Sequence, residues 1–275
     1  MKSRMSSRII ELSLFIVIVA ASDNKYCQFS CNGSAHTVCN REKEKCDAGP
    51  LCGSEFKYIE LTDDDRQFIL DLHNNLRNEI ASGQHLSPPA ANMNALSYNK
   101  ELEFIAHCWA NACNGKPLKH DVCRRTAEYN YVGQNLGWWS STSSDFDLRS
   151  GIKKSIMNWF NEVANFDPAV TNSFASGKKT IGHYTQLVWA DTLEIGCGVS
   201  FYIKQREGRR WYDKILACNY GPGGNYLGQP VYKIGKPASK CSKRKPNKKY
   251  TALCGKDIPL NQTLRFKDEF FNVSI

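Results

Sequence analysis

The sequence has only one long apolar run, at residues 9–20, and Glu11 and Ser13 interrupt it. A transmembrane helix needs about 20 predominantly apolar residues, so this run is too short to span a membrane. Three basic residues precede the run, and small residues that suit cleavage after Ser22 follow it. This order predicts a secretory signal peptide over residues 1–22. Because no second apolar run follows, we expect a soluble protein that is secreted into the extracellular space.

Two short motifs that would indicate particular functions are absent. The lack of an Arg-Gly-Asp tripeptide removes the simplest basis for integrin binding. The lack of a Gly-x-Ser-x-Gly stretch leaves Ser155 and Ser173 without the sharp turn that exposes a nucleophilic serine. The chain has 12 cysteines, and an even number can pair completely and leave no free thiol. The sequence therefore argues against an enzyme with a serine or cysteine nucleophile.

The cysteines themselves indicate a disulfide-rich extracellular protein. All 12 lie beyond Ser22, and an even number in a secreted chain favours disulfide bonds. The spacing of Cys108 and Cys113 is also compatible with metal binding, but an oxidising compartment makes that the minor alternative. Three Asn-x-Ser/Thr sequons suit the same compartment and predict glycosylation at Asn32, Asn261 and Asn272.

Acidic residues are missing from one segment near the C-terminus. The formal net charge is +9, and removal of three basic residues and one acid with residues 1–22 leaves +7. Residues 233–249 carry eight basic side chains and no acidic one. Such a segment either binds sulfated glycans or anionic membrane surfaces, or it is a flexible, solvated tail. Nucleic acid is not an expected partner of a secreted protein.

Three segments have the spacing of amphipathic helices. Thr62 is a good N-cap for the first, because three aspartates follow it and favour the positive end of the helix dipole. Gly83 predicts the end of this helix, and the second is expected over residues 99–111. The apolar positions of the three are Ile69, Leu72, Leu76 and Ile80; Leu102, Ile105, Ala106 and Trp109; and Ile152, Ile156, Trp159, Phe160 and Val163. His73, on the first helix, is predicted to have a packing or hydrogen-bonding role.

Two later segments predict an antiparallel hairpin. Residues from Cys197 onward alternate apolar with small or polar side chains, residues 211–218 favour a strand, and the polar residues 205–209 favour a turn. Pairing about that turn places Cys197 opposite Cys218 and Ile203 opposite Tyr212, so the two cysteines lie within disulfide reach. Residues 133–139 are expected to form a strand entry or turn, and residues 140–144 a surface loop.

Three stretches together resemble one known family. They are GHYTQLVWA at residues 182–190, GCG at residues 196–198 and CNYGPGGNYLG at residues 218–228. This set is similar to the CAP superfamily of cysteine-rich secretory, antigen 5 and pathogenesis-related proteins, and most of all to insect venom antigen 5. The resemblance implies an α+β fold, a three-layer α-β-α sandwich. It divides the mature chain into a cysteine-rich arm (23–60), a CAP domain (61–233) and a basic C-terminal extension (234–275).

The resemblance also implies a set of disulfide bonds. The antigen 5 pattern implies Cys27–Cys39, Cys31–Cys123, Cys52–Cys113 and Cys197–Cys218. Four cysteines remain, and we expect them to pair as Cys46–Cys108 and Cys241–Cys254. An exchange of Cys46 with Cys52 stays open, because both lie close together in the sequence.

Many members of the family carry two histidines and two glutamates in a cleft. The matching residues are His120, Gln134, Glu162 and His183, so an amide replaces one acid, as it does in similar antigen 5 proteins. An amide accepts no proton and ligates metals poorly compared with a carboxylate. The remaining His120, His183 and Glu162 either hold a divalent metal such as zinc or form a polar cluster that organises the cleft.

These features lead to one main functional hypothesis and two alternatives. The main hypothesis is a secreted, non-enzymatic binding protein of the antigen 5 type that needs no cofactor, an effector or allergen of venom, saliva or reproductive secretions. Its partner would be an extracellular protein or a small apolar ligand. One alternative is a carrier of lipids or sterols with a groove framed by the first and third helices. The other is a metal-dependent hydrolase that uses His120, His183 and Glu162.

Overall fold

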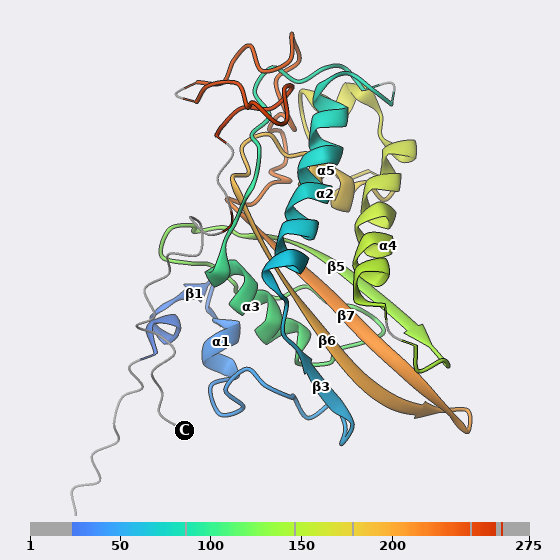
Figure 1. Ribbon diagram of the computed structural model, residues 1–275. Coiled ribbons are helices and arrows are strands. Elements are labelled where there is room, and N and C mark those ends of the chain that lie inside the picture. The colour runs from blue at the N-terminus through green and yellow to red at the C-terminus, as the bar shows by residue number, and fades with distance from the viewer. Residues whose placement is uncertain are drawn as a thin grey trace, which may run out of the picture.

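The computed structural model describes residues 24–256, apart from Leu86, Phe146, Lys178 and Lys243, and also describes Leu260. A twisted antiparallel sheet forms its centre, with the strand order β3-β6-β7-β5 (Figure 1). A short strand, β4, adds to β6 in parallel. The strands are β3 (Phe56–Ile59), β4 (Ser97–Tyr98), β5 (Gly133–Ser141), β6 (Glu194–Arg206) and β7 (Arg209–Gly221). A separate pair, β1 (Ser30–Cys31) and β2 (Ser34–Ala35), lies in the N-terminal arm.

Helices cover both faces of the sheet. On one face lie α2 (Asp63–Ala81), α4 (Leu148–Asn161) and α5 (Gly182–Leu187), whose apolar side chains share one core cluster with Cys197 and Cys218. On the other face α3 (Lys100–Ala110) packs on β6 and β7. The shorter helices are η1 (Lys25–Gln28), α1 (Thr37–Asn40), η2 (Glu162–Asn165) and η3 (Pro168–Thr171). The α+β class and the three-layer sandwich are therefore confirmed. Within the described part of the chain, no helix is both long and apolar enough to cross a membrane.

The GCG sequence of β6 explains how closely α3 approaches the sheet. A Cβ atom on Gly196 would lie 2.2 Å from the backbone nitrogen of Glu103, and one on Gly198 would lie 2.3 Å from that of His107. Both distances are shorter than any side-chain contact allows, so only glycine fits at these two positions. Cys197, between them, points to the opposite face, where it bonds Cys218.

The predicted starts and ends of the helices are largely confirmed. Thr62 caps α2 in a capping box with Asp65, and Gly83 follows its end with φ +88°. His73 has the predicted hydrogen-bonding role, because its Nδ1–H donates to the Ile69 carbonyl at 2.8 Å and its Nε2 accepts from the Tyr220 hydroxyl at 3.0 Å. The third helix ends at Asn161, so Val163 lies in η2 and not in the helix as predicted.

The predicted hairpin register is confirmed, with Cys197 opposite Cys218 and Ile203 opposite Tyr212. The predicted turn is too long. The strands continue to Arg206 and from Arg209, and only Glu207 and Gly208 connect them. Both have positive φ values, 51° and 70°, which is the conformation that two-residue hairpin turns require. Similarly, β5 continues to Ser141, where a loop was expected, because it pairs with β7 along nine residues.

Six disulfide bonds join the described cysteines, and none of these cysteines is free. The four pairs that the resemblance implies are present, and the exchange that the sequence left open resolves to Cys46–Cys108 and Cys52–Cys113. These two bonds tie the N-terminal arm to the end of α3 and the turn that follows it. The complete set is Cys27–Cys39, Cys31–Cys123, Cys46–Cys108, Cys52–Cys113, Cys197–Cys218 and Cys241–Cys254.

The described part of the C-terminal segment packs on the rest of the molecule. Tyr250 and Leu253 are buried in the main core, and the backbone N–H of Cys254 donates to the Met93 carbonyl at 2.8 Å. Lys249 forms an ion pair with Asp71 of α2 at 2.8 Å. The described residues of 234–256, which leave out Lys243, are thus anchored at several points, and this excludes a freely solvated tail for them. The predicted signal peptide and the sequons at Asn261 and Asn272 lie outside the described residues, whereas Asn32 is exposed.

Three buried histidines make the fold sensitive to acid. Burial lowers the pKa of His36, His73 and His107 to about 4. The unfolded chain, with a histidine pKa near 6.5, therefore binds more protons than the folded chain between pH 6.5 and pH 4. The stability that these neutral imidazoles contribute is complete above pH 6.5 and is lost as the pH falls through that window. Asp121 has the opposite effect on stability. Burial raises its pKa to about 6, so at this group the folded chain binds more protons than the unfolded chain as the pH falls.

We expect His107→Phe to remove about one third of the loss in unfolding free energy that the three buried histidines cause in acid. The His107 ring stacks on Tyr58 at 5.1 Å, and neither ring nitrogen has a hydrogen-bond partner among the described residues, so phenylalanine keeps the contact and loses the titration. A pKa of about 4 costs the wild type about 2 kcal/mol at pH 5. Urea unfolding at pH 5 and 7.5 should show that the variant loses about 2 kcal/mol less than the wild type. Equal losses would contradict this role, and the exposed His85→Gln variant is the control.

Candidate functional site

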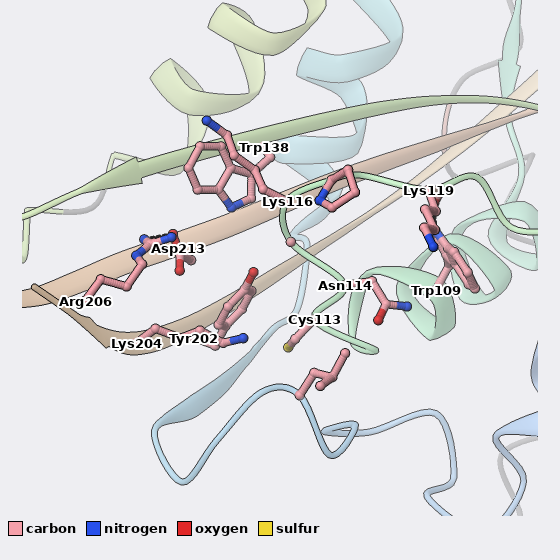
Figure 2. Close-up of a pocket in the computed structure, with 13 residues that line it drawn as sticks. Trp109, Cys113, Asn114, Lys116, Lys119, Trp138, Tyr202, Lys204, Arg206 and Asp213 are labelled. Carbon is pink, nitrogen blue, oxygen red and sulfur yellow. Dashed lines mark hydrogen bonds and ion pairs between the residues drawn. The ribbon is translucent and has the colours of Figure 1, made fainter.

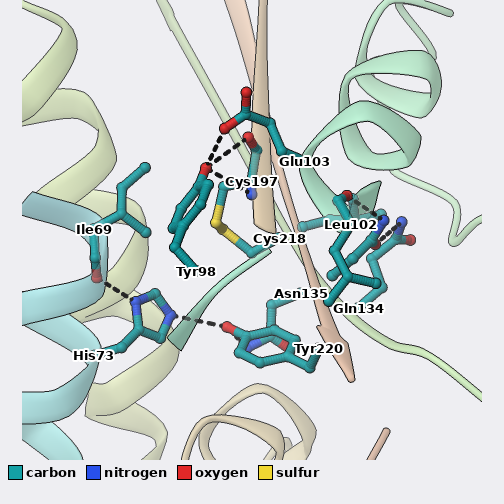
Figure 3. The surroundings of a disulfide bond; sticks show 12 residues. Ile69, His73, Tyr98, Leu102, Glu103, Gln134, Asn135, Cys197, Cys218 and Tyr220 are labelled. Carbon is teal, nitrogen blue, oxygen red and sulfur yellow. Dashed lines mark hydrogen bonds between the residues drawn. A yellow bond between two sulfur atoms is a disulfide. The ribbon is translucent and has the colours of Figure 1, made fainter. Parts of the chain in front are cut away.

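Gln134 lies near the start of β5, and a chain of amide contacts fixes its orientation (Figure 3). Its Nε2 donates to Asn219 Oδ1 at 3.1 Å, and Asn219 Nδ2 in turn donates to the Leu102 carbonyl at 3.3 Å. The carbonyl can only accept, so each amide in the chain has one possible orientation. Gln134 Oε1 therefore faces the other way, where it accepts from the backbone N–H of Asp121 at 3.1 Å.

His120 is held by this same amide oxygen. Its Nδ1 lies 3.1 Å from Gln134 Oε1, which can only accept, so Nδ1 carries the proton and Nε2 has the lone pair. Loss of hydration lowers the pKa of His120 and the contact with Gln134 opposes this, while Arg124 and His183 lower the pKa further. The imidazole is therefore kept neutral, and Nε2 is its one acceptor.

Glu162 forms a second, separate pair with His183. Its Oε2 accepts from the backbone N–H groups of His183 at 2.9 Å and Tyr184 at 3.2 Å, which are the first N–H groups of α5. Its Oε1 lies 2.6 Å from Nδ1 of His183. The carboxylate thus caps α5 and also orients the imidazole. Trp159 stacks on the His183 ring, with the ring centres 6.2 Å apart and the planes inclined by 15°.

The four predicted residues are therefore joined as two pairs, His120 with Gln134 and Glu162 with His183. The two imidazoles interact electrostatically, but within residues 24–256 no three His, Cys, Asp or Glu side chains gather as candidate metal ligands. The expected metal set of His120, His183 and Glu162 therefore stays a prediction. Both oxygens of Glu162 already accept hydrogen bonds from His183 and Tyr184, which favours the alternative of a polar cluster.

Two residues that position the site were missed by the sequence analysis. Asn219 fixes the Gln134 amide, and Asp121, buried next to His120, accepts from the Thr37 hydroxyl of the N-terminal arm. The signal for Asn219 was its place within CNYGPGGNYLG. Its contact could be inferred only from the pairing of β5 with β7, which puts Gln134 opposite Asn219.

Two exposed tyrosines, one of them next to Asn225 in the chain, form a rim that is connected to the start of α5. Tyr131 and Tyr226 are 44% and 45% exposed, and their ring centres are 5.1 Å apart. Asn225, next to Tyr226, donates from Nδ2 to the Gly182 carbonyl at 2.8 Å and so ties this rim to the start of α5. The rim therefore presents tyrosine rings that other molecules can contact.

Four isoleucines of α2 and α4 are fully buried and do not line an open groove. Ile69 and Ile80 of α2 and Ile152 and Ile156 of α4 have no exposed surface and belong to the main core. Their side chains pack on the sheet and leave no open space between the helices and the sheet at these positions. A lipid carrier that uses these residues would first have to displace the core.

The comparisons with known proteins agree with this fold. The family model described as "CAP: Cysteine-rich secretory protein family" matches residues 70–220. Venom allergen 5.01 of Dolichovespula maculata is 41% identical over 82% of this chain and 96% of its own length. Venom allergen 3 of Solenopsis invicta is 39% identical over 77% of this chain and 90% of its own. These relatives and the six disulfides indicate an extracellular protein.

Solved structures show the same fold. One, NaASP2 with Zn2+, is 28% identical, covers 71% of this chain and 97% of its own, and has a TM-score of 0.55. Another, BmVAL-1, is 25% identical, covers 75% of this chain and 99% of its own, and has a TM-score of 0.57. The first of these proteins was solved with zinc.

Proposed function

This chain belongs to the CAP, or cysteine-rich secretory protein, family, and on that premise we propose that it is a secreted, non-enzymatic binding protein of the venom allergen type. The observation that carries the proposal is the separation of the four cleft residues into two hydrogen-bonded pairs. The role of an effector or allergen in a secretion is taken from the printed names of its relatives.

The proposed lack of catalysis is supported by what Glu162 and Gln134 already do, which leaves only the two imidazole Nε2 atoms of the four residues as free acceptors. A general base needs a free lone pair and a pKa near the working pH. Glu162 accepts from two backbone N–H groups and one imidazole, and proton uptake would remove the charge that caps α5. Gln134 has no basic site. The pairs are therefore structural elements that hold the cleft in one shape.

The exposed rim supports a role in binding. Tyrosine is enriched at protein interfaces because it combines a large apolar area with a hydroxyl group and few rotatable bonds. The backbone that carries these rings is tied to the framework, since Gly223 N–H donates to the Tyr131 carbonyl at 2.8 Å and Asn225, next to Tyr226, donates to the Gly182 carbonyl. A rigid, partly exposed pair of this kind suits contact with an extracellular protein.

Zinc does not fit these residues as a catalytic metal. Catalytic zinc sites have three protein ligands and one open position. The cleft has two imidazole Nε2 atoms and no available carboxylate. The metal-dependent hydrolase is therefore the weaker interpretation, and no step of catalysis is derived for it.

Calorimetric titration with zinc at neutral pH tests this proposal. We expect the zinc affinity of the wild type to agree within about twofold with that of the His120→Ala/His183→Ala double variant, a change of less than about 0.5 kcal/mol. The exposed His85→Ala variant controls for loss of a surface imidazole. Tight binding that disappears in the double variant and persists in the control would contradict the proposal, because it would show a complete metal site.

A further inference from the structure

A concave site lies on the α3 side of the sheet, and its lining reaches Lys119, the neighbour of His120 in the chain. It has a volume of about 630 Å³ and is framed by the end of α3, the loop at residues 113–119 and the strands β6 and β7 (Figure 2). Trp138 of β5 contributes one wall and lies four residues beyond Gln134, about 13 Å along the strand. The site contains none of the residues His120, Gln134, Glu162 and His183.

Cationic side chains surround this pocket. Lys116, Lys119 and Lys204 line it, and among the described residues no carboxylate lies within 4 Å of their ammonium groups. Arg206 is different, because it pairs with Asp213 at 2.6 Å and donates to Ser140 at 2.8 Å. The pocket therefore has three positive charges that no acidic side chain neutralises.

Aromatic rings form the walls on which these cations lie. The Lys116 ammonium lies 4.4 Å from the centre of the Trp138 ring, and that of Lys204 lies 5.5 Å from the Tyr202 ring. At the other end Trp109 donates from Nε1 to the Lys119 carbonyl at 3.0 Å, which fixes that ring beside the third lysine. Figure 2 shows these three positions on different sides of the pocket.

The arrangement selects one class of ligand. The lysines do not converge on one point, so a single phosphate or sulfate ion would meet only one of them at a time. A flat membrane surface would not reach the rings, because these line a concave site. A ligand that carries several anionic groups on sugar rings with hydroxyls matches what is present. The pocket offers separated cations, aromatic faces and the amide of Asn114 as a polar partner.

We propose that this pocket binds an acidic sugar unit of a sulfated glycan. Sulfate groups meet Lys116, Lys119 and Lys204, and the sugar ring lies against Trp109, because Lys116 and Arg206 already lie over the Trp138 ring. The inference is independent of the proposed function of the cleft, because it uses different residues. It also places glycan binding away from the basic segment at residues 233–249, since Figure 1 shows the C-terminal segment (red) at the end of the sheet opposite the β6–β7 turn.

The test is a titration of the secreted protein with a heparin-derived hexasaccharide, followed by tryptophan fluorescence and calorimetry. The Lys116→Gln/Lys119→Gln/Lys204→Gln variant should bind at least about tenfold more weakly, because charge contacts at such a site add affinity in modest steps. Lys236→Gln/Lys240→Gln/Lys248→Gln removes the same charge from exposed residues of the C-terminal segment. This control should keep the affinity within about twofold.

Four other outcomes would each decide against the proposal. Equal losses in both triple variants would mean that only net charge matters, and a loss in the control alone would place the glycan on the C-terminal segment. A poly-glutamate peptide that binds as tightly as the hexasaccharide would mean an acidic peptide site. No binding by the wild type would also overturn the proposal. Unchanged binding by His120→Ala/His183→Ala is expected, and it separates this site from the cleft.

Discussion

Replacement of Arg77 by methionine should cost the folded protein about 4 kcal/mol or more. Arg77 of α2 has no exposed surface and no carboxylate within 4 Å among the described residues. Its guanidinium instead donates four hydrogen bonds to three backbone carbonyls, those of Asn94, Leu187 and Trp189, at 2.6 to 2.9 Å. Methionine fills a similar volume but leaves all three buried carbonyls without these donors, each at a cost of about 1–3 kcal/mol.

The same variant should loosen the cleft. The Leu187 carbonyl is at the last residue of α5, whose first turn carries His183, so Arg77 connects α2 to the helix that presents the imidazole. Urea unfolding with intact disulfides measures the loss. Arg77→Lys should recover less than half of it, because one ammonium cannot reproduce a planar fork of donors. The control is Arg210→Met, whose ion pair with Glu55 is about half exposed, so its loss should cost little stability. Similar losses in Arg77→Met and Arg210→Met would contradict this role.

Gly196→Ala should have a comparable effect for a steric reason. The new Cβ would lie 2.2 Å from the Glu103 nitrogen, 2.4 Å from the Asn99 carbonyl oxygen and 2.6 Å from the Leu102 carbonyl carbon. All three are backbone atoms, so no side-chain rotation can relieve the overlap. The disulfides at Cys108 and Cys113 also restrain the far end of α3. Because overpacking costs 1–3 kcal/mol even where side chains can adjust, we expect a loss of about 4 kcal/mol or more.

Thermal unfolding and the secreted yield measure this effect. Gly177→Ala is the matched control, because no atom lies within 4 Å of the position its Cβ would take. The control should unfold within a few degrees of the wild type, while Gly196→Ala should unfold far lower or fail to be secreted. A loss below about 1 kcal/mol would mean that α3 can move away from the sheet at little cost.

Local sequence signals predicted most of the fold. The Thr62 cap, the apolar spacing of the helices and the alternation after Cys197 each report interactions between residues close in the chain or across one turn. The hairpin register was therefore predictable down to Cys197 opposite Cys218. The exact turn was not, because five polar residues at 205–209 are compatible with several loop lengths until the pairing of Arg206 with Arg209 is known.

The site was less predictable, because it depends on contacts between distant segments. Sequence resemblance identified the four cleft residues, but not that Glu162 caps α5 through the N–H groups of His183 and Tyr184. The pocket between Lys116, Trp138 and Lys204 joins a loop and two strands, and no spacing within the chain indicates it. The packing of residues 234–256 on α2 was also hidden, because their lysine-rich composition is typical of solvated tails.

One assay tests the central claim, that the two cleft pairs are structural and not catalytic. The secreted protein would be incubated with peptide and ester substrates, with and without added zinc, beside the His120→Ala/His183→Ala variant. We predict hydrolysis at the uncatalysed rate for both proteins under all conditions, because Glu162 and Gln134 are fully engaged in hydrogen bonds. Turnover by the wild type that the double variant abolishes would contradict the claim.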